Sequence, residues 1–352
     1  MLRVGLVGCG RIAKRHSELL GFGEIDGATL AGVCDLITEK AQAIGERFDV
    51  PHFDNMHDMM KQVDPDVVVV LTESGLHADN TVELAPYKKH IVVEKPMALT
   101  LADADRMIAA CEEHNVRLFI VKQNRFNVPV TKLREALEAD RFGKLVIGTV
   151  RVRWCRRQNY YDQDEWRGTW GMDGGVLTNQ ASHHIDLLEW MMGDVESVFA
   201  HTKTALVDIE TEDTAVVVLK FRSGALGIVE ATTAARPTDL EGSISILGEN
   251  GTVEIGGFAV NEMKVWRFQE PVEDDERVLS DFSVNPPNVY GFGHKEYYQH
   301  VIDSIRYEKP QLVGGHQGRR SLELISAMYE SVETGKEVAL ENFVPKHSRL
   351  GQ

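Results

Sequence analysis

The sequence predicts an α/β protein of two domains, and three observations support this fold class. The chain has 352 residues, which is more than a single domain usually holds. Its first third alternates short apolar runs with amphipathic segments, as parallel βαβ units do. Later, strand-like segments follow one another through short turns that contain glycine. We therefore expect a doubly wound parallel sheet over 1–121, and an α/β domain with a large open mixed or antiparallel sheet over 122–352.

The expected elements of the first domain follow from composition and periodicity. Its strands are nearly all apolar, as strands covered by helices on both faces must be. They are expected at 2–7, 30–34, 67–71, 91–93 and 118–121, with helices at 13–20, 39–48, 78–87 and 102–114.

The second domain begins with a helix at 130–138 and a long strand at 145–156. A helix is expected from Asn179 to Met192, because apolar residues recur there at helical spacing. The later strands are expected at 195–204, 214–221, 225–232, 242–247, 252–255 and 262–268, before helices at 294–305 and 318–334. The acidic, proline-containing stretch 270–290 is expected to be a surface excursion.

Charge and cysteine content exclude several classes of protein. With 54 acidic and 38 basic residues the net charge is −16, which repels nucleic acid and anionic membranes. No apolar run exceeds five residues, whereas a membrane-spanning helix needs about 20. The chain opens on a strand-like segment rather than a signal peptide, and its four cysteines show no CxxC spacing. We expect a cytoplasmic globular enzyme with no bound metal.

A glycine-rich turn follows the first expected strand. Residues 8–13 read G-x-G-x-x-A, in which Gly8 permits a tight turn and Gly10 lets a pyrophosphate approach the backbone. Arg11 and Ile12 open the helix whose free N–H groups would hold the phosphates. Asp35 ends the second strand, where a carboxylate binds ribose hydroxyls and repels a 2′-phosphate, so NAD is favoured over NADP.

Two further loops are expected beside the nucleotide. Thr72, Ser74 and His77 follow another buried strand and should line the second half of the site, with His77 a helix-start or cofactor-edge residue rather than a catalyst. Glu94 and Lys95 end a third core strand, where elsewhere they would be an ordinary ion pair. Here we interpret them as lining the cofactor crevice, with Lys95 stabilising an alkoxide or joining proton transfer.

The segment around His183 has the residues of an acid–base site. Asn179 and His183 are four positions apart, so one face of the expected helix would carry both. An amide and an imidazole there can hold a substrate hydroxyl and remove its proton. The alternative is that His183 and His184 are packed core histidines, and Asp186 either orients an imidazole or is a capping or surface residue.

A basic and aromatic cluster occurs on this acidic chain. Arg153, Arg156 and Arg157 precede Tyr160 and the Trp166-Arg167 pair. Guanidinium groups bind phosphate or carboxylate with two hydrogen bonds. Such a cluster predicts an anionic ligand, or else a charge ladder along a strand edge.

Three motifs in order resemble the Gfo/Idh/MocA oxidoreductases over nearly the whole chain: residues 8–13, Glu94-Lys95-Pro96, and 174–186 with its Gly-Gly and His183-x-x-Asp186. The resemblance implies an N-terminal Rossmann domain and a C-terminal open sheet that often mediates oligomerisation, here a homodimer or homotetramer. It also implies that Lys95 and His183 flank the reacting carbinol beside the nicotinamide.

A narrower resemblance is to the UDP-N-acetyl-2-amino-2-deoxy-D-glucuronate dehydrogenases of bacterial surface-polysaccharide synthesis. The segments that carry it are 121–125, 160–162, 166–170 and 179–183. It implies that Gln123, Trp166 and Arg167 lie near NAD. It also implies that Arg157, Tyr160 and Asn179 contact the substrate. Many inositol and glucose dehydrogenases carry Asp where this chain has Asn179.

The implied reaction is NAD-dependent oxidation of the 3′-hydroxyl of UDP-N-acetyl-D-glucosaminuronate. One alternative is a dehydrogenase of free myo-inositol or a monosaccharide. The other is a non-catalytic dinucleotide sensor, since a fold alone does not determine function.

Overall fold

The computed structural model describes residues 1–283 and 292–352. They form two compact units, the first made of 1–122 and 294–322 and the second of 123–293 and 323–352. The chain therefore returns to the first unit after residue 293. The sequence-based expectation of two continuous domains, 1–121 and 122–352, did not include this return.

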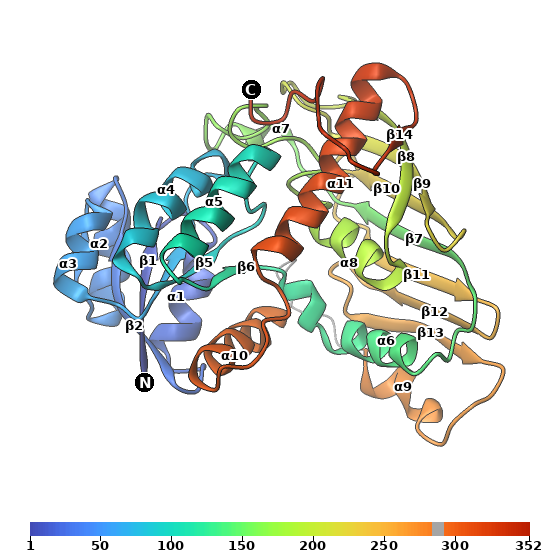
Figure 1. The fold of residues 1–352 in the computed structure, drawn as a ribbon, viewed down its shortest axis with the longest axis horizontal. Helices are drawn as coiled ribbons and strands as arrows, with labels where there is room; N and C mark the ends of the chain where they lie inside the picture. Colours follow the sequence, from blue (N-terminus) through green and yellow to red (C-terminus); the bar gives the residue numbers. More distant parts are fainter. Residues whose placement is uncertain (284–291) are drawn as a thin grey trace. The chain divides into compact units, whose positions relative to one another are not determined.

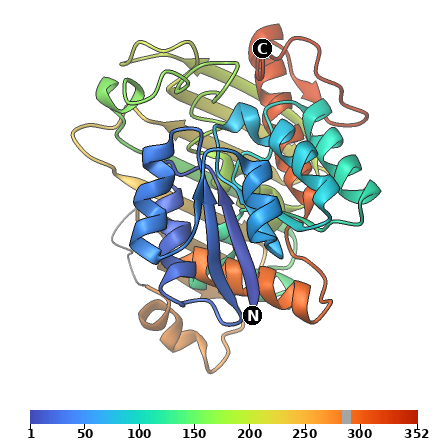
Figure 2. The same ribbon diagram turned by 90° about the vertical axis from the view of Figure 1, so that its left-hand side faces the viewer.

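The first unit is built on a parallel sheet with helices on both faces (Figure 2). Its strands are β1 (Leu2–Val7), β2 (Ala28–Cys34), β3 (His52–Phe53), β4 (Val67–Val70), β5 (His90–Val93) and β6 (Leu118–Ile120). Its helices are α1 (Ala13–Gly21), α2 (Thr38–Phe48), α3 (Met56–Val63), α4 (His77–Leu84), α5 (Leu101–Glu113) and most of α10 (Gly293–Arg306), with short 3₁₀ turns η1 (Ser74–Leu76) and η2 (Ala85–Tyr87).

The strand order is β3-β2-β1-β4-β5-β6, with all neighbours parallel. The order reverses between β1 and β4, and loops at the carboxyl ends of strands beside such a reversal form the usual ligand crevice of doubly wound sheets. Gly8 follows β1 and Thr72 follows β4. The expected parallel Rossmann architecture is confirmed.

Two short elements of this unit escaped the sequence reasoning. Strand β3 has two residues, too few to show a period. Helix α3 is capped by Asn55, whose side chain accepts hydrogen bonds from the N–H groups of His57 and Asp58. Its buried side is largely methionine, which carries a weaker periodic signal than a run of Leu or Val.

The second unit holds an eight-stranded mixed sheet (Figure 1). Its strands are β7 (Leu145–Arg153), β8 (Val195–Lys203), β9 (Thr214–Phe221), β10 (Leu226–Thr232), β11 (Glu241–Gly248), β12 (Gly251–Gly256), β13 (Glu262–Phe268) and β14 (Val338–Ala339). Its helices are η3 (Gln123–Phe126), α6 (Val128–Glu138), α7 (Gln158–Tyr161), α8 (Ser182–Met192), α9 (Asp275–Asp281) and part of α11 (Gly315–Thr334).

The strand order is β13-β12-β11-β7-β10-β9-β8-β14, in which β7 and β10 are parallel and the other pairs are antiparallel. Helix α8 packs on β7 and β11. Burial alternates along β9, where Val217 and Leu219 face the core while Val216 and Val218 are each 50% exposed. The sheet is thus covered on one face and open on the other, and the expected large mixed sheet is confirmed.

Two expectations for this unit need correction. Helix α8 begins at Ser182, so Asn179 lies in the turn before the helix and does not share a helical face with His183. The turn before the helix is held by tertiary contacts instead, because the Asn179 amide donates to Asp173 and the Leu177 N–H donates to Glu212. In the expected excursion 270–290, residues 275–281 form helix α9 and 284–290 lie outside the described residues.

Within the described ranges, no helix has both the length and the apolar character needed to cross a bilayer.

Candidate active site

The glycine turn between β1 and α1 has the shape that a pyrophosphate requires. Gly8 has a φ of +96°, and a Cβ there would lie 2.6 Å from the backbone carbon of Leu71, so only glycine fits. A Cβ on Gly10 would meet no atom within 4 Å. Arg11 is exposed, and Ile12 is the residue before the first turn of α1. Bare, open backbone at a helix N-terminus suits a bound phosphate.

Asp35 is tied to this turn directly. Its Oδ2 accepts a hydrogen bond from the N–H of Cys9 at 2.7 Å, and its Oδ1 accepts one from the N–H of Ile37 at 2.8 Å. Each carboxylate oxygen has a second lone pair for a ribose hydroxyl. The residues after Asp35 are the exposed Leu36 and Ile37, so no cation follows it to receive a 2′-phosphate. The residues present fit NAD.

His77 links the loops that follow β4 and β5. It is buried at the start of α4, with Nδ1 2.8 Å from the carbonyl oxygen of Pro96 and Nε2 3.0 Å from that of Thr72. Burial lowers the pKa of its imidazole. The hydroxyl of Thr72 accepts a hydrogen bond from Asn80, and Ser74 is buried in η1. His77 thus acts as a bridge between the two loops.

Glu94 turns its carboxylate into the first unit. Its N–H donates to the carbonyl oxygen of Val70, which continues the β4–β5 pairing. Oε2 accepts a hydrogen bond from the N–H of Lys95 at 2.9 Å, and Oε1 lies 3.0 Å from Nε2 of His16. Burial raises the pKa of Glu94, but the hydrogen bond from His16 and the nearby imidazole of His294 outweigh it and hold that pKa well below its ordinary value. The carboxylate therefore stays ionised beneath Lys95.

The two adjacent histidines of α8 have different environments. His184 is fully buried against Trp154, burial lowers its pKa to about 3, and neither ring nitrogen has a hydrogen-bond partner among the described residues. His183 lies 3.1 Å, Nε2 to Nε2, from the side chain of Gln123, whose amide N–H donates. His184 is therefore the packed core histidine, and His183 has a basic, unprotonated Nε2.

Asp186 contacts a residue that the sequence reasoning did not consider. Its two oxygens accept hydrogen bonds at 2.8 Å from Nε and an Nη of Arg125, and both side chains are buried. The Arg125 guanidinium also lies over the Trp190 ring, 4.8 Å from its centre. This ion pair anchors α8, the helix that carries His183, to the segment that carries Gln123.

Buried carboxyl groups hold the turn that presents Asn179. The Asn179 amide donates to Asp173, whose other oxygen accepts from the N–H of Gly168 at 2.8 Å. Glu212 accepts from the N–H of Leu177 at 3.0 Å and from the hydroxyl of Tyr329 at 2.8 Å. Burial raises the pKa of Glu212 to about 7.

Comparison with known proteins assigns the chain to a family. Residues 2–122 match the family model for the NAD-binding Rossmann fold of an oxidoreductase family, and residues 134–340 match the model for its C-terminal α/β domain. The chain belongs to the Gfo/Idh/MocA oxidoreductases. It is therefore an NAD-dependent enzyme, as the glycine turn and Asp35 predicted.

Three relatives show where this Gfo/Idh/MocA member lies within the family. The WlbA dehydrogenases of Bordetella pertussis and Chromobacterium violaceum, both solved with NADH and UDP-GlcNAcA, are each 43% identical to it with a TM-score of 0.90. Each alignment covers 97% of this chain, with 98% and 97% of the respective structures. The myo-inositol 2-dehydrogenase of Thermotoga maritima is 30% identical over 97% of this chain and 100% of that protein.

The arginine cluster of this Gfo/Idh/MocA member is divided between two roles. Arg153 on β7 pairs with Glu230 and Glu241 on the flanking strands, and Arg156 pairs with Asp239. These two form a charge ladder along the sheet, the alternative that the sequence left open.

The remaining members of the cluster lie farther along the chain. Arg157 is exposed and reaches only the carbonyl oxygen of Pro237, at 3.4 Å, among the contacts described. Arg167 pairs with Asp164 and donates to the Tyr160 hydroxyl at 3.0 Å, and its guanidinium lies over the Trp166 ring. Arg167, Tyr160 and Trp166 thus form one assembled group, next to which Arg157 presents a guanidinium to solvent.

Sequence reasoning missed His16, Arg125 and Glu212. All three are buried polar residues whose partners lie far along the chain. A polar residue at a buried position of a helical pattern is one possible signal, and His16 occupies such a position on the buried side of α1.

Proposed function

We propose that this oxidoreductase oxidises the 3′-hydroxyl of UDP-N-acetyl-D-glucosaminuronate (UDP-GlcNAcA) to the 3-keto sugar. The observation that carries the proposal is the 43% identity, over nearly the full length, to two dehydrogenases solved with NADH and that sugar nucleotide. The product would serve surface-polysaccharide synthesis in the cytoplasm.

In this proposal Lys95 and His183 both act on the carbinol that is oxidised. The hydroxyl proton passes to Nε2 of His183, whose single lone pair is released when the substrate hydroxyl takes the place of the Gln123 amide. The O–H electron pair becomes the second C–O bond of the ketone as hydride leaves the carbon. When bound, NAD supplies the hydride acceptor. The Lys95 ammonium stabilises the developing alkoxide.

The remaining predicted site residues keep their proposed places. Gly8, Gly10, Arg11, Ile12, Asp35, Thr72, Ser74, His77, Glu94, Gln123, Trp166 and Arg167 are proposed to line the NAD site. Asn179, held by Asp173, would orient the sugar, and Arg157 and Tyr160 would contact the substrate. An amide at position 179 holds a hydroxyl without adding negative charge, which suits a substrate that already carries a diphosphate and a carboxylate.

The open face of the eight-stranded sheet supports a homo-oligomer. Val218 on β9 lies opposite Ile228 on β10, and these two residues are 50% and 36% exposed. Val216 and Leu226 extend the same apolar area, each 50% exposed. Contiguous apolar surface of this kind marks interaction sites, so we propose that the dimer or tetramer forms here.

The test is turnover by the purified protein with NAD and a panel of UDP-GlcNAcA, other UDP-sugars, myo-inositol and free monosaccharides, followed by the absorbance of reduced nicotinamide. Reduction with the uronate supports the proposal. Reduction with myo-inositol alone would favour the second candidate, which rests on the 30% identity to an inositol dehydrogenase. NAD binding with no turnover on any sugar would favour the remaining alternative, a non-catalytic dinucleotide sensor.

Two substitutions then test the catalytic residues. Lys95→Ala and His183→Ala should each lower turnover by about a hundredfold or more while NAD still binds. Lys61→Ala and His201→Ala are matched controls, because both residues are exposed on elements of the same units. Near-normal turnover of both catalytic variants would show that the site is elsewhere.

A further inference from the structure

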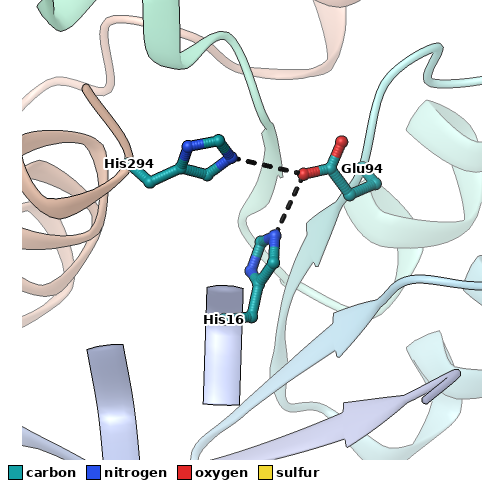
Figure 3. Close-up of side chains that lie close together, drawn as sticks. All are labelled: His16, Glu94 and His294. Carbon is teal, nitrogen blue, oxygen red and sulfur yellow. Dashed lines mark hydrogen bonds and ion pairs between the residues drawn. The ribbon is translucent and has the colours of Figure 1, made fainter. Parts of the chain in front are cut away.

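At the Glu94 carboxylate, three side chains from distant parts of the sequence of the first unit meet (Figure 3). His16 comes from α1, Glu94 from the end of β5, and His294 from the start of α10, and all three are buried. Their ligand-type atoms all lie within 4.8 Å of one another. Within 1–283 and 292–352 this is the group of His, Cys and carboxylate side chains dense enough to hold a metal ion.

The hydrogen-bond directions show which protons the cluster holds. Burial raises the pKa of Tyr298 well above its ordinary value, so its hydroxyl keeps its proton. That hydroxyl lies 2.6 Å from Nδ1 of His16 and donates to it, which places the ring proton on Nε2. Nε2–H then donates to Oε1 of Glu94 at 3.0 Å. A metal-binding imidazole needs that nitrogen unprotonated, so the contacts favour a hydrogen-bonded chain over a metal centre.

The chain ends on the backbone of Lys95. Oε2 of Glu94 accepts the N–H of Lys95 at 2.9 Å, and the carbonyl oxygen of Pro96 lies 2.8 Å from Nδ1 of His77. The peptide group before Lys95 and the one after Pro96 are thus each held by a hydrogen bond, which limits the movement of the backbone at Lys95. A catalytic ammonium needs such fixing, because a misplacement of about 1 Å can cost roughly a hundredfold in rate.

We propose that His16 is a positioning residue for Lys95, acting through the carboxylate of Glu94. The inference rests on the proposed catalytic role of Lys95. His16 holds Glu94 in the orientation that binds the Lys95 N–H, and Tyr298 holds His16 in the tautomer that can donate. Without the donor on Nε2, the carboxylate turns or takes up a proton, and the Lys95 backbone is released.

The pH behaviour follows from the groups that face Glu94. They are His16 from α1, His294, Tyr297 and Tyr298 from α10, His77 from the start of α4 and Lys95 from the loop after β5, with Arg15 beside His294. In the wild type the carboxylate stays ionised in the acidic range. Loss of the His16 donor lets Glu94 bind a proton at higher pH, so the acid limb of the kcat profile should move to higher pH.

Two amide variants separate positioning from packing. In His16→Gln the amide nitrogen can occupy the place of Nε2 and donate to Glu94. In His16→Asn the shorter side chain reaches Tyr298 but not Glu94. We expect His16→Gln to keep kcat within about threefold and His16→Asn to lose about tenfold or more, with the KM for NAD nearly unchanged and the acid limb displaced only in the Asn variant.

Equal kcat values and equal pH profiles for the two variants would overturn the proposal, whether both are active or both impaired. So would a stoichiometric metal ion in the purified wild type that is lost from His16→Asn, measured by elemental analysis. If the wild type oxidises no sugar, the proposed function fails separately. The inference is then decided by a crystal structure of His16→Asn, in which an intact hydrogen bond between Lys95 N–H and Glu94 would refute it and a broken one would support it.

Discussion

The substitution Glu212→Gln should make the second unit more stable at neutral pH than the wild type. Glu212 is only 3% exposed, and burial raises the pKa of its carboxyl from 4.5 to about 7, against hydrogen bonds from the Leu177 N–H and Tyr329. Glutamine has the same shape and can still accept both hydrogen bonds, but it has no charge to bury. A Cβ on Gly175 would lie 2.1 Å from Oε2 of Glu212, so the fit is close and an isosteric replacement is needed.

The sign and size of the effect follow from linkage. Since the folded pKa lies above the unfolded one, the favourable contribution of Glu212 is complete below pH 4.5 and is lost as the pH rises through 7. The difference between 4.5 and about 7 corresponds to about 3 kcal/mol. From the same two pKa values, the contribution of Glu212 to the free energy of unfolding falls by about 1 kcal/mol at pH 5 and by about 3 kcal/mol at pH 7.

The assay is urea unfolding of both proteins between pH 5 and pH 7, followed by tryptophan fluorescence. Subtracting the two free energies of unfolding cancels the titration of groups that the substitution leaves alone. We expect the variant to gain about 2 kcal/mol over the wild type across this interval. Glu165→Gln, at an exposed position, is the control and should show no such trend. A difference that stays constant with pH would refute the assignment of a neutral buried carboxyl.

Three other predictions follow from single contacts. Asp35→Ala should weaken NAD binding by about tenfold and reduce the preference for NAD over NADP, measured by titration with each; an unchanged preference would contradict the role of its carboxylate. Arg125→Ala removes the bidentate partner of the buried Asp186 and should cost about 3 kcal/mol in urea unfolding; a loss below about 1 kcal/mol would mean that the pair is not buried in solution. Val216→Lys with Val218→Lys should dissociate an oligomer that uses the open sheet face; light scattering on a sizing column that reports the same mass for variant and wild type would place the interface elsewhere.

Local geometry explains why NAD was predictable from the sequence and why residues for its site can be proposed. Gly8, Gly10 and Asp35 follow β1 and β2 directly, and their roles depend on backbone shape within a few residues of a strand end. Lys95 was identified for the same reason, since a strand end followed by proline is visible without knowledge of the fold.

The failed expectation for Asn179 has a different cause. Helical spacing from 179 to 192 is genuine, but Asp173 and Glu212 supply hydrogen bonds to the turn before α8 that outweigh local helix propensity. Likewise, nothing in the spacing of His183 and His184 showed that only one of the two would be fully packed without polar contacts.

By itself, the sequence determined the family, the cofactor and the main strands of the first unit, because turns and apolar strands are encoded by neighbouring residues. Only the tertiary structure decided which polar side chains are paired in the interior. His16 and Tyr298 are 282 positions apart, and Glu212 meets Tyr329 across 117. Whether such groups are charged, neutral or donors depends on the burial and the partners that folding brings to them, and no local pattern encodes either.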